Sequence, residues 1–216
     1  MPGYLTRELR LQLGDRHYSI RALEDRQQFS DADGAAERIG ISSANWSLFG
    51  QVWPAGVALA EAMTTFEVAG KRVLELGCGL GLSSLVLQQR EAQVVASDHH
   101  PLAETFLMHN ASANGLPHVT FRHLSWARTD AALGRFDLII GADILYERDH
   151  VDLLAAVLHR HGEAHCEVLI ADPGRGNANH FSRALQHQGY TASESRRAFD
   201  PELPERRRGR MLSYVR

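Results

Sequence analysis

From about Val73 onward, short apolar runs alternate with segments that have helical spacing. The apolar runs are KRVLELG, QVVASD, VTFRHL, RFDLIIGADILY and EVLIADPG. This order predicts a parallel sheet with helices on both faces. Nearly continuous apolar strands are typical of a sheet covered on both sides. Because ligands of such sheets bind outside the carboxyl ends of the strands, we expect any site to lie there.

The two ends of the chain follow another pattern. Leu9, Leu11 and Leu13 alternate with polar residues before a Gly14-Asp15 turn, and a second alternating run follows, which predicts a β-hairpin. The tail from residue 192 predicts two strands around a charged loop. Between hairpin and helices lies a polar segment, 24–51, that is too long for a routine loop. We interpret it as a mobile lid or as a segment ordered by ligand.

Composition excludes several classes of protein. The 216 residues carry a formal charge of −3, which gives no general attraction to nucleic acid or to anionic membranes. The N-terminus lacks an apolar signal core, and no uncharged apolar run approaches the ~20 residues of a membrane span. Two cysteines, Cys78 and Cys166, provide neither a disulfide framework nor a CxxC metal knuckle. A soluble, cytoplasmic protein is therefore expected.

A histidine cluster and an arginine-rich run need not be a metal site and a nucleic-acid site. His159 and His161 lie two residues apart at a predicted helix end, so they do not share a face, and no metal site is expected. The run ERRRGR at 205–210 indicates a solvated loop, although it could attract an acidic protein or RNA. In a slightly acidic chain, nucleic acid is not the expected partner.

The stretch VLELGCGLG places Glu75, Gly77, Gly79 and Gly81 at alternate positions after a strand. A tight strand-to-helix turn uses glycine for its backbone angles and for close approach to a ligand. No lysine follows, as a Walker loop requires, and the dinucleotide pattern would need glycine at position 82. About 20 residues later the next strand ends at Asp98, which could accept both hydroxyls of a ribose. The plainer alternative is a tight turn with Asp98 capping the next helix.

At these residues the sequence resembles the class I S-adenosylmethionine-dependent methyltransferases. The resemblance implies that the three glycines line the cofactor, S-adenosyl-L-methionine, with Glu75 near its methionine part. Asp98 would hold the ribose hydroxyls, and His99 would lie by the adenine. The implied fold is α/β: a Rossmann-like, doubly wound, mostly parallel seven-stranded sheet with an antiparallel C-terminal strand. Residues 1–45 would then form a hairpin and lid-like extension, and residues 46–216 the methyltransferase domain.

Further stretches resemble the seven-β-strand lysine methyltransferases. FGQVWPAGVALA is similar to the segment ahead of their glycine loop, and ADILYERD is similar to their D-x-x-Y motif. IADPGR resembles the branch that modifies the β subunit of electron-transfer flavoprotein, long labelled nicotinamide N-methyltransferase-like. The resemblance places Asp143 and Tyr146 at the substrate, with Asp143 also near the cofactor and Trp53 closing the cofactor's other side. The chain departs from many relatives at Ser125, where they have an acid, but Trp126 can still cover the adenine ring.

The function implied is N-methylation, with a lysine side chain of a protein as the first choice of substrate. The alternatives are a small-molecule amine or heterocycle as substrate, or a non-catalytic regulatory protein that binds the cofactor. Asp143 and Tyr146 could instead be a helix-capping region and a packed aromatic residue. Asp172 and Arg175 could belong to a simple turn in which Arg175 only pairs with Asp172.

Overall fold

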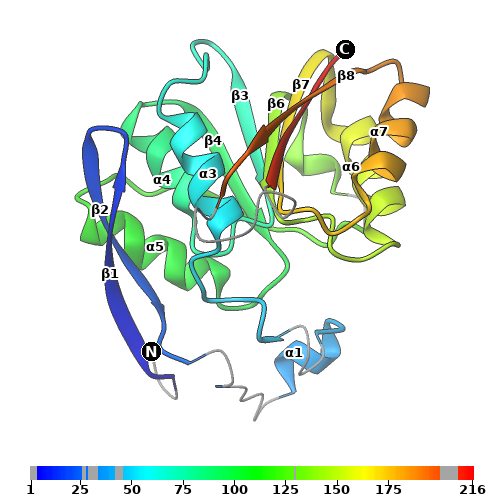
Figure 1. The fold of residues 1–216 in the computed structure, drawn as a ribbon. Helices are drawn as coiled ribbons and strands as arrows, with labels where there is room; N and C mark the ends of the chain where they lie inside the picture. The colour runs from blue at the N-terminus through cyan, green and yellow to red at the C-terminus, as the bar shows by residue number, and fades with distance from the viewer. Residues whose placement is uncertain (1–3, 26–27, 29–33, 42–45, 129, 200–208) are drawn as a thin grey trace.

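The computed structural model describes residues 4–25, 28, 34–41, 46–128, 130–199 and 209–216. Its centre is a seven-stranded sheet with strand order β5-β4-β3-β6-β7-β9-β8 (Figure 1). The strands are β3 (Arg72–Leu76), β4 (Gln93–Asp98), β5 (Thr120–His123), β6 (Phe136–Ala142), β7 (Gly162–Asp172), β8 (Thr191–Arg197) and β9 (Gly209–Val215). Strands β3 to β7 pair in parallel, and β9 is antiparallel to both of its neighbours. The predicted α/β fold class is confirmed.

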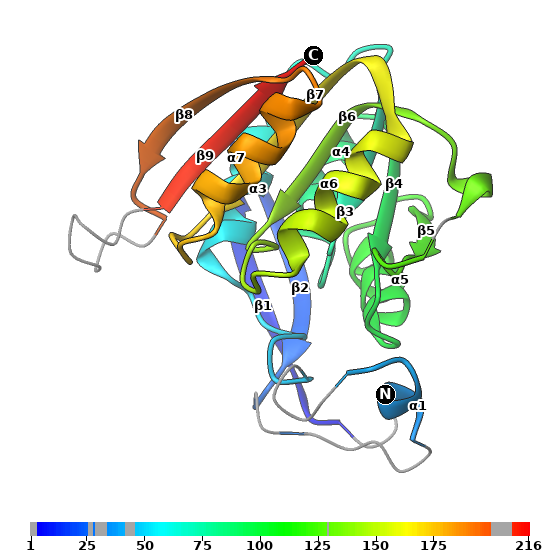
Figure 2. The same cartoon turned by 90° about the vertical axis from the view of Figure 1, so that its right-hand side faces the viewer.

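Helices cover both faces of the sheet, as the alternation predicts (Figures 1 and 2). One face carries α3 (Pro54–Met63), α4 (Leu82–Gln89) and α5 (Ala103–Ala113), and the other carries α6 (His150–His161) and α7 (Ala178–His187). The described residues also form two short helices, α1 (Ala35–Arg38) and η1 (Ala131–Leu133). Among the described residues, no helix is both long and apolar enough to cross a membrane.

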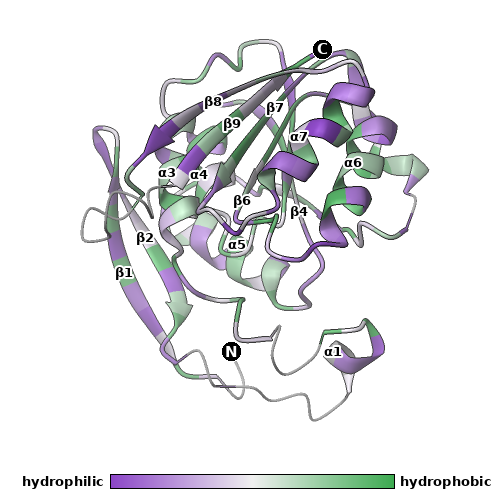
Figure 3. Ribbon diagram, turned by 45° about the vertical axis from the view of Figure 1, so that its right-hand side comes forward, coloured by the Kyte–Doolittle hydropathy of each residue, from purple (hydrophilic) through white to green (hydrophobic). Residues whose placement is uncertain are grey.

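Each central strand supplies two hydrophobic cores, one on each face. In β3, Val73 is buried with α3, α4 and α5, whereas Leu74 and Leu76 are buried with α6 and α7. Successive side chains of a strand point to opposite faces, so one apolar run serves both cores. Hydrophobic colouring accordingly concentrates on the inner strands in Figure 3, while the edge strand β8 is largely polar. The same alternation puts Glu75 on the α4 face, beside Val73.

The predicted hairpin is confirmed as β1 (Thr6–Leu13) and β2 (Arg16–Leu23), which pair in antiparallel register. Its inward residues Leu13 and Ile20 are buried in the core that α3, α4 and α5 share. Figure 1 shows the hairpin lying alongside α5. The N-terminal section therefore extends the hydrophobic core of the domain.

Two asparagines of α5 fix the hairpin in place. Asn114 exchanges two hydrogen bonds with the backbone of Ser19, both 2.8 Å long. Asn110 accepts from the backbone N–H of Arg21 at 2.8 Å and donates to the carbonyl oxygen of Leu80 at 3.0 Å. Since Leu80 lies within the glycine loop, the buried Asn110 amide connects β2 directly to that loop.

One boundary differs from the sequence prediction. Strand β7 begins at Gly162, directly after α6, and so starts earlier than EVLIADPG predicts. Gly162 pairs with Phe136, and the register shifts before the pairing resumes at Leu138. A Cβ on Gly162 would lie 2.8 Å from the carbonyl oxygen of Leu158, so only glycine fits this direct turn from helix to strand. The two C-terminal strands are confirmed as β8 and β9, and the charged loop of 200–208 lies outside the described residues.

Candidate active site

A cavity of about 520 Å³ lies at the carboxyl edge of the parallel strands. This is the edge where ligands of doubly wound sheets bind, and the volume is within the range of small-molecule sites. The N-terminal segment also contributes, through residues 40–41, 48–51 and 53. The predicted site residues that line it are Trp53, Gly77, Gly79, Asp98, His99, Ser125, Trp126, Asp143 and Tyr146. Glu75 and Gly81 do not line the cavity.

In the glycine loop, Gly77 and Gly79 line the cavity, whereas Gly81 faces the core. Gly79 has φ +53°, and a Cβ built there would have no atom within 4 Å. Gly81 has φ +84°, and a Cβ there would lie 2.2 Å from Cδ1 of Leu107 in α5. Gly79 thus leaves open space for a ligand, whereas Gly81 allows α4 to start close against α5.

Asp98 ends β4 and holds the loop after β3. Its Oδ2 accepts the backbone N–H of Gly79 at 2.8 Å, and its Oδ1 accepts that of His100 at 2.7 Å. Burial raises the pKa of Asp98, although hydrogen bonds from these N–H groups oppose the shift. A carboxylate has about four lone-pair sites, so each oxygen can still accept one further hydrogen bond. Asp98 therefore holds the glycine turn and also faces the cavity. It does not cap the next helix, α5, which has Leu102 at its N-cap and no side-chain capping hydrogen bond.

Glu75 lies beneath the loop and joins β3 to α4. Its Oε2 accepts the backbone N–H of Ser84 at 2.9 Å and also the hydroxyl of Ser84. Burial raises its pKa to about 7, and hydrogen bonds with Ser84 and Ser83 act in the opposite direction. These contacts satisfy donors at the first turn of α4, a position that favours an acidic side chain.

Histidines and aromatic residues line the end of the cavity beyond β4. The His99 Nε2 lies 2.6 Å from the carbonyl oxygen of Ile39, which ties the N-terminal segment to the end of β4. Its ring also stacks with that of His123 at 5.5 Å. Across the cavity, Trp126 approaches the glycine loop, with its Cζ2 3.7 Å from where a Cβ of Gly77 would lie.

A second histidine after β4, His100, is buried and holds the segment that begins at residue 46. The ring of His100 stacks on Phe49 with centroids 3.8 Å apart, and Trp46 packs against it at 4.5 Å. Burial lowers the pKa of His100 to about 3, so the ring is neutral at physiological pH. Trp46 and Phe49 are therefore core anchors, and Phe49 also lines the cavity.

On the far side of the glycine loop, Asp143 follows β6 in a left-handed conformation, with φ +53°. Its backbone N–H donates to the carbonyl oxygen of Ala171 in β7 at 2.8 Å. Arg175 donates to both carboxylate oxygens, from Nε at 2.8 Å and from Nη2 at 2.6 Å. The alternative that Arg175 only pairs with Asp172 is wrong, because Asp172 is buried and pairs with Arg210 at 3.2 Å.

Tyr146 packs edge-on against His150, the first residue of α6, with ring centroids 4.6 Å apart. His150 also meets Trp126 edge-on at 5.0 Å, so one imidazole joins the two aromatic residues. Burial raises the pKa of Tyr146 to about 12, which keeps its hydroxyl protonated at neutral pH. The sequence did not indicate His150 as a site residue, because Tyr146 precedes α6 and no helical spacing relates the two positions.

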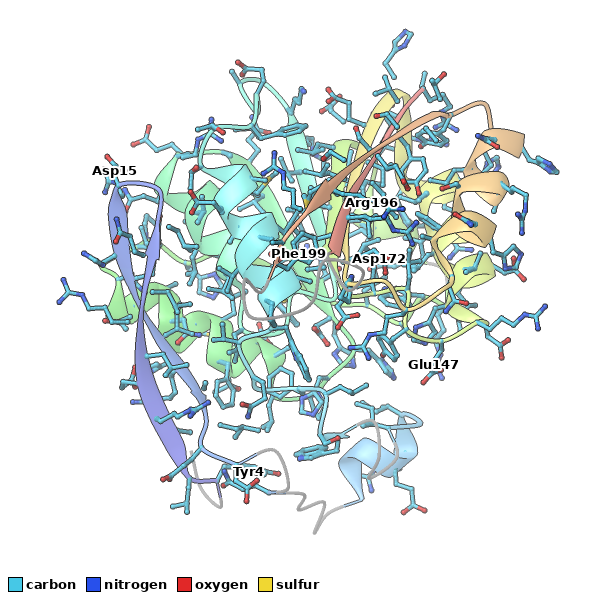
Figure 4. All side chains as sticks on the ribbon, viewed as in Figure 1. Tyr4, Asp15, Glu147, Asp172, Arg196 and Phe199 are labelled. Carbon is cyan, nitrogen blue, oxygen red and sulfur yellow. The ribbon has the colours of Figure 1, made fainter. Side chains whose placement is uncertain are left out.

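Charged groups around this half of the cavity lie on one side of the molecule. Figure 4 shows Glu147 and Asp172 on the side of α6 and β7, well away from Asp15 at the hairpin turn. The Oε2 of Glu147 lies 3.3 Å from Nε2 of His150.

Within the described part of the chain, no group of three or more His, Cys, Asp or Glu side chains could hold a metal ion.

Comparison with known proteins places the chain among methyltransferases. The family described as lysine methyltransferase matches residues 38–188. The electron transfer flavoprotein beta subunit lysine methyltransferase of Mus musculus is 33% identical over 153 residues, covering 69% of this chain and 57% of that protein. Protein N-lysine methyltransferase METTL21A of Mus musculus is 32% identical over 160 residues, covering 70% of this chain and 72% of that protein. The chain thus spans little more than half the length of the first relative.

Solved structures share the fold at low identity. The T. Thermophilus 16S rRNA N2 G1207 methyltransferase, in complex with AdoMet and guanosine, has a TM-score of 0.64 at 18% identity, covering 98% of this chain and 51% of its own. The ribosomal protein L11 methylase of Lactobacillus delbrueckii has a TM-score of 0.56 at 21% identity, covering 73% and 76%. Identities this low establish the shared fold alone.

Proposed function

Because the chain belongs to the lysine methyltransferase family, we propose that it is an S-adenosylmethionine-dependent enzyme that methylates a lysine side chain of a protein. One observation carries the proposal. A single cavity is bounded on one side by the open Gly79 and Asp98, and on the other by Asp143 and Tyr146. A donor of methyl groups and an acceptor amine could therefore meet within it.

The residues of the loop fit the cofactor. Gly79 leaves room for close approach of a ligand to the backbone, and Asp98 keeps lone pairs for the two hydroxyls of a ribose. Trp126 and His99 offer ring faces beside the same space. When bound, S-adenosylmethionine would supply a methyl group on an excellent leaving group, so the protein has mainly to position the acceptor.

The opposite wall suits an amine. The Asp143 carboxylate and the Tyr146 hydroxyl can accept hydrogen bonds from an N–H group, and the Tyr146 ring can face a cation. No covalent nucleophile is required, in agreement with the buried, un-ionised state of Cys78, whose pKa burial raises. We also propose a cytoplasmic location. This proposal rests on the cysteine content alone, because a chain with two cysteines has no disulfide framework of the kind found in secreted proteins.

A small-molecule amine is the second candidate substrate, and one observation favours it. Gly40 and Ile41 from the N-terminal segment line the cavity, which narrows the access that a protein side chain would need. A long, unbranched lysine side chain is still compatible with a cavity of about 520 Å³, and the relatives named above are protein methyltransferases.

The test is transfer of labelled methyl from S-adenosylmethionine into a cell extract, separated into protein, nucleic-acid and small-molecule fractions. We expect a discrete labelled protein, with label in acid-stable methyl-lysine, that the Asp143→Ala variant does not produce. Label confined to small molecules would favour the second candidate. Cofactor binding without transfer to any fraction would contradict catalysis and favour a regulatory role.

A further inference from the structure

The acid assigned to the acceptor amine is already held by another side chain. Both oxygens of Asp143 accept hydrogen bonds from Arg175, at 2.8 Å and 2.6 Å, although the two residues follow different strands. The Asp143 side chain is 13% exposed and that of Arg175 is 40% exposed. Two-pronged pairing of this kind fixes geometry as well as charge.

Unpaired, a carboxylate at this position would work against the proposed reaction. A lysine amine can attack only after losing a proton, and its ordinary pKa of about 10.4 leaves it mostly protonated at neutral pH. A neighbouring negative charge stabilises the ammonium form and raises that pKa further. Asp143 can therefore help an amine only if its charge is compensated.

Resting on the proposed lysine methylation, we propose that Arg175 is a positioning residue that neutralises Asp143 and thereby favours the uncharged form of the acceptor amine. The paired carboxylate keeps lone pairs that can accept N–H hydrogen bonds and orient the amine. The proton of the ammonium passes to bulk water, so no residue has to store it. Arg175 acts through Asp143 and need not touch the substrate.

Arg175 is the one lysine or arginine among the described residues that line the cavity. The acids near it have other partners, since Asp172 pairs with Arg210 and Glu147 lies beside His150. Within the part of the chain that the structure describes, compensation of Asp143 thus depends on Arg175. Asp172, which is paired with Arg210, also acts on Arg175. The other titratable groups on the described cavity wall are Asp98, His99, His100, Tyr146, Glu147 and His150.

The first readout is the pH dependence of methyl transfer to the labelled acceptor protein. In Arg175→Gln we expect the rising limb of the profile of rate against pH to shift to higher pH by about one unit. The rate at neutral pH then falls about tenfold and recovers at high pH. Arg175→Lys, which keeps the charge, should stay within about threefold of the wild type. Asp143→Asn should shift this limb to lower pH, and the double variant with both Arg175→Gln and Asp143→Asn should return it toward the wild-type pH. The other titratable groups are present in all variants, so their titration does not contribute to the differences.

The second readout needs no turnover. Binding of n-butylammonium to the purified protein is measured by NMR near neutral pH, with n-butanol as the uncharged control. We expect Arg175→Gln to bind the cation about tenfold more tightly and Asp143→Asn to bind it more weakly, while n-butanol affinity stays constant.

The two readouts separate the inference from the proposed function. If Arg175→Gln changes neither the cation affinity nor the pH midpoint, Arg175 has only a structural role and the inference is overturned, whatever the rate. If the affinities change as expected but the wild type transfers methyl to no fraction, charge compensation is supported and the proposed function fails.

Discussion

The two walls of the cavity are built in different ways. The loop wall, Gly77–Gly81 with Asp98, depends on left-handed glycines and on backbone N–H groups that donate to a partly buried carboxylate. The acceptor wall, Asp143, Tyr146 and Arg175, depends on contacts between side chains: an ion pair and an edge-on ring contact. The backbone shapes the first wall, and side chains shape the second.

This difference separates what each wall can tolerate. A wall made of backbone in rare conformations is coupled to folding, because Gly81 packs on α5 and Asp98 closes the turn after β3. A wall made of partly exposed side chains can change without disturbing the sheet. We therefore expect changes in the loop wall to alter cofactor affinity and stability, and changes in the acceptor wall to alter turnover.

The largest effect should come from Asp98→Ala. Loss of hydrogen bonds from two ribose hydroxyls to a carboxylate, at about 1.5–3 kcal/mol each, should weaken S-adenosylmethionine binding about 10²- to 10⁴-fold in calorimetry. Asp152→Ala, which removes an exposed acid of α6 that does not line the cavity, is the matched control. Unchanged affinity in a folded Asp98→Ala protein would remove this residue from the cofactor site.

Glu75→Gln should show that the buried acid of this region serves folding. Burial raises the pKa of Glu75 from 4.5 to about 7, so the folded state holds the proton more tightly than the unfolded state. Its stabilising contribution is complete below the unfolded value and is lost as pH rises through about 7. Between about pH 4.5 and pH 7 and above, the wild type should therefore lose roughly 3 kcal/mol of unfolding free energy relative to Glu75→Gln.

Urea unfolding of both proteins over the same pH range measures this difference directly. Groups that titrate alike in the two proteins cancel from it. A difference that stays constant with pH would show that Glu75 titrates in the folded protein as it does in the unfolded chain.

A pair of glycine variants should divide the loop wall into folding and binding parts. Gly81→Ala places a Cβ 2.2 Å from Leu107 in a left-handed backbone, which should cost about 2–3 kcal/mol of stability. In Gly79→Ala the added Cβ has no atom within 4 Å, so the only loss of stability should be the about 1–2 kcal/mol that a left-handed backbone costs an alanine. Despite the smaller cost, Gly79→Ala should weaken cofactor binding more. Equal affinities for the two variants, measured by calorimetry alongside urea unfolding, would contradict this division.

The comparison also explains what could be predicted from sequence. The fold and the loop wall depend on local patterns: alternating apolar runs, glycines after a strand, and an acid at the end of the next strand. The attachment of the hairpin to α5 could not be predicted this way. It depends on Asn110 and Asn114, whose partners in β2 lie 89 and 95 residues away.

The acceptor wall was predictable only in its residue types. The D-x-x-Y spacing points to Asp143 and Tyr146, but the partner of Asp143 comes from a loop 32 residues further along. Proximity in sequence suggested Asp172 for Arg175, and the fold instead buries Asp172 against Arg210. Which opposite charges pair is decided when β6 and β7 bring their carboxyl ends together, and no short motif records it.

The smallest effect tests the acceptor wall itself. Tyr146→Phe removes one hydroxyl, which its raised pKa of about 12 keeps protonated, and leaves the ring contact with His150 intact. One net hydrogen bond is worth about 0.5–1.5 kcal/mol, so the transfer rate should fall about two- to tenfold while calorimetry finds cofactor affinity unchanged. A weakened cofactor affinity would mean that Tyr146 belongs to the loop wall in function. A loss of rate beyond about 100-fold would mean that the hydroxyl does more than hold the amine, because a single neutral hydrogen bond does not account for that much.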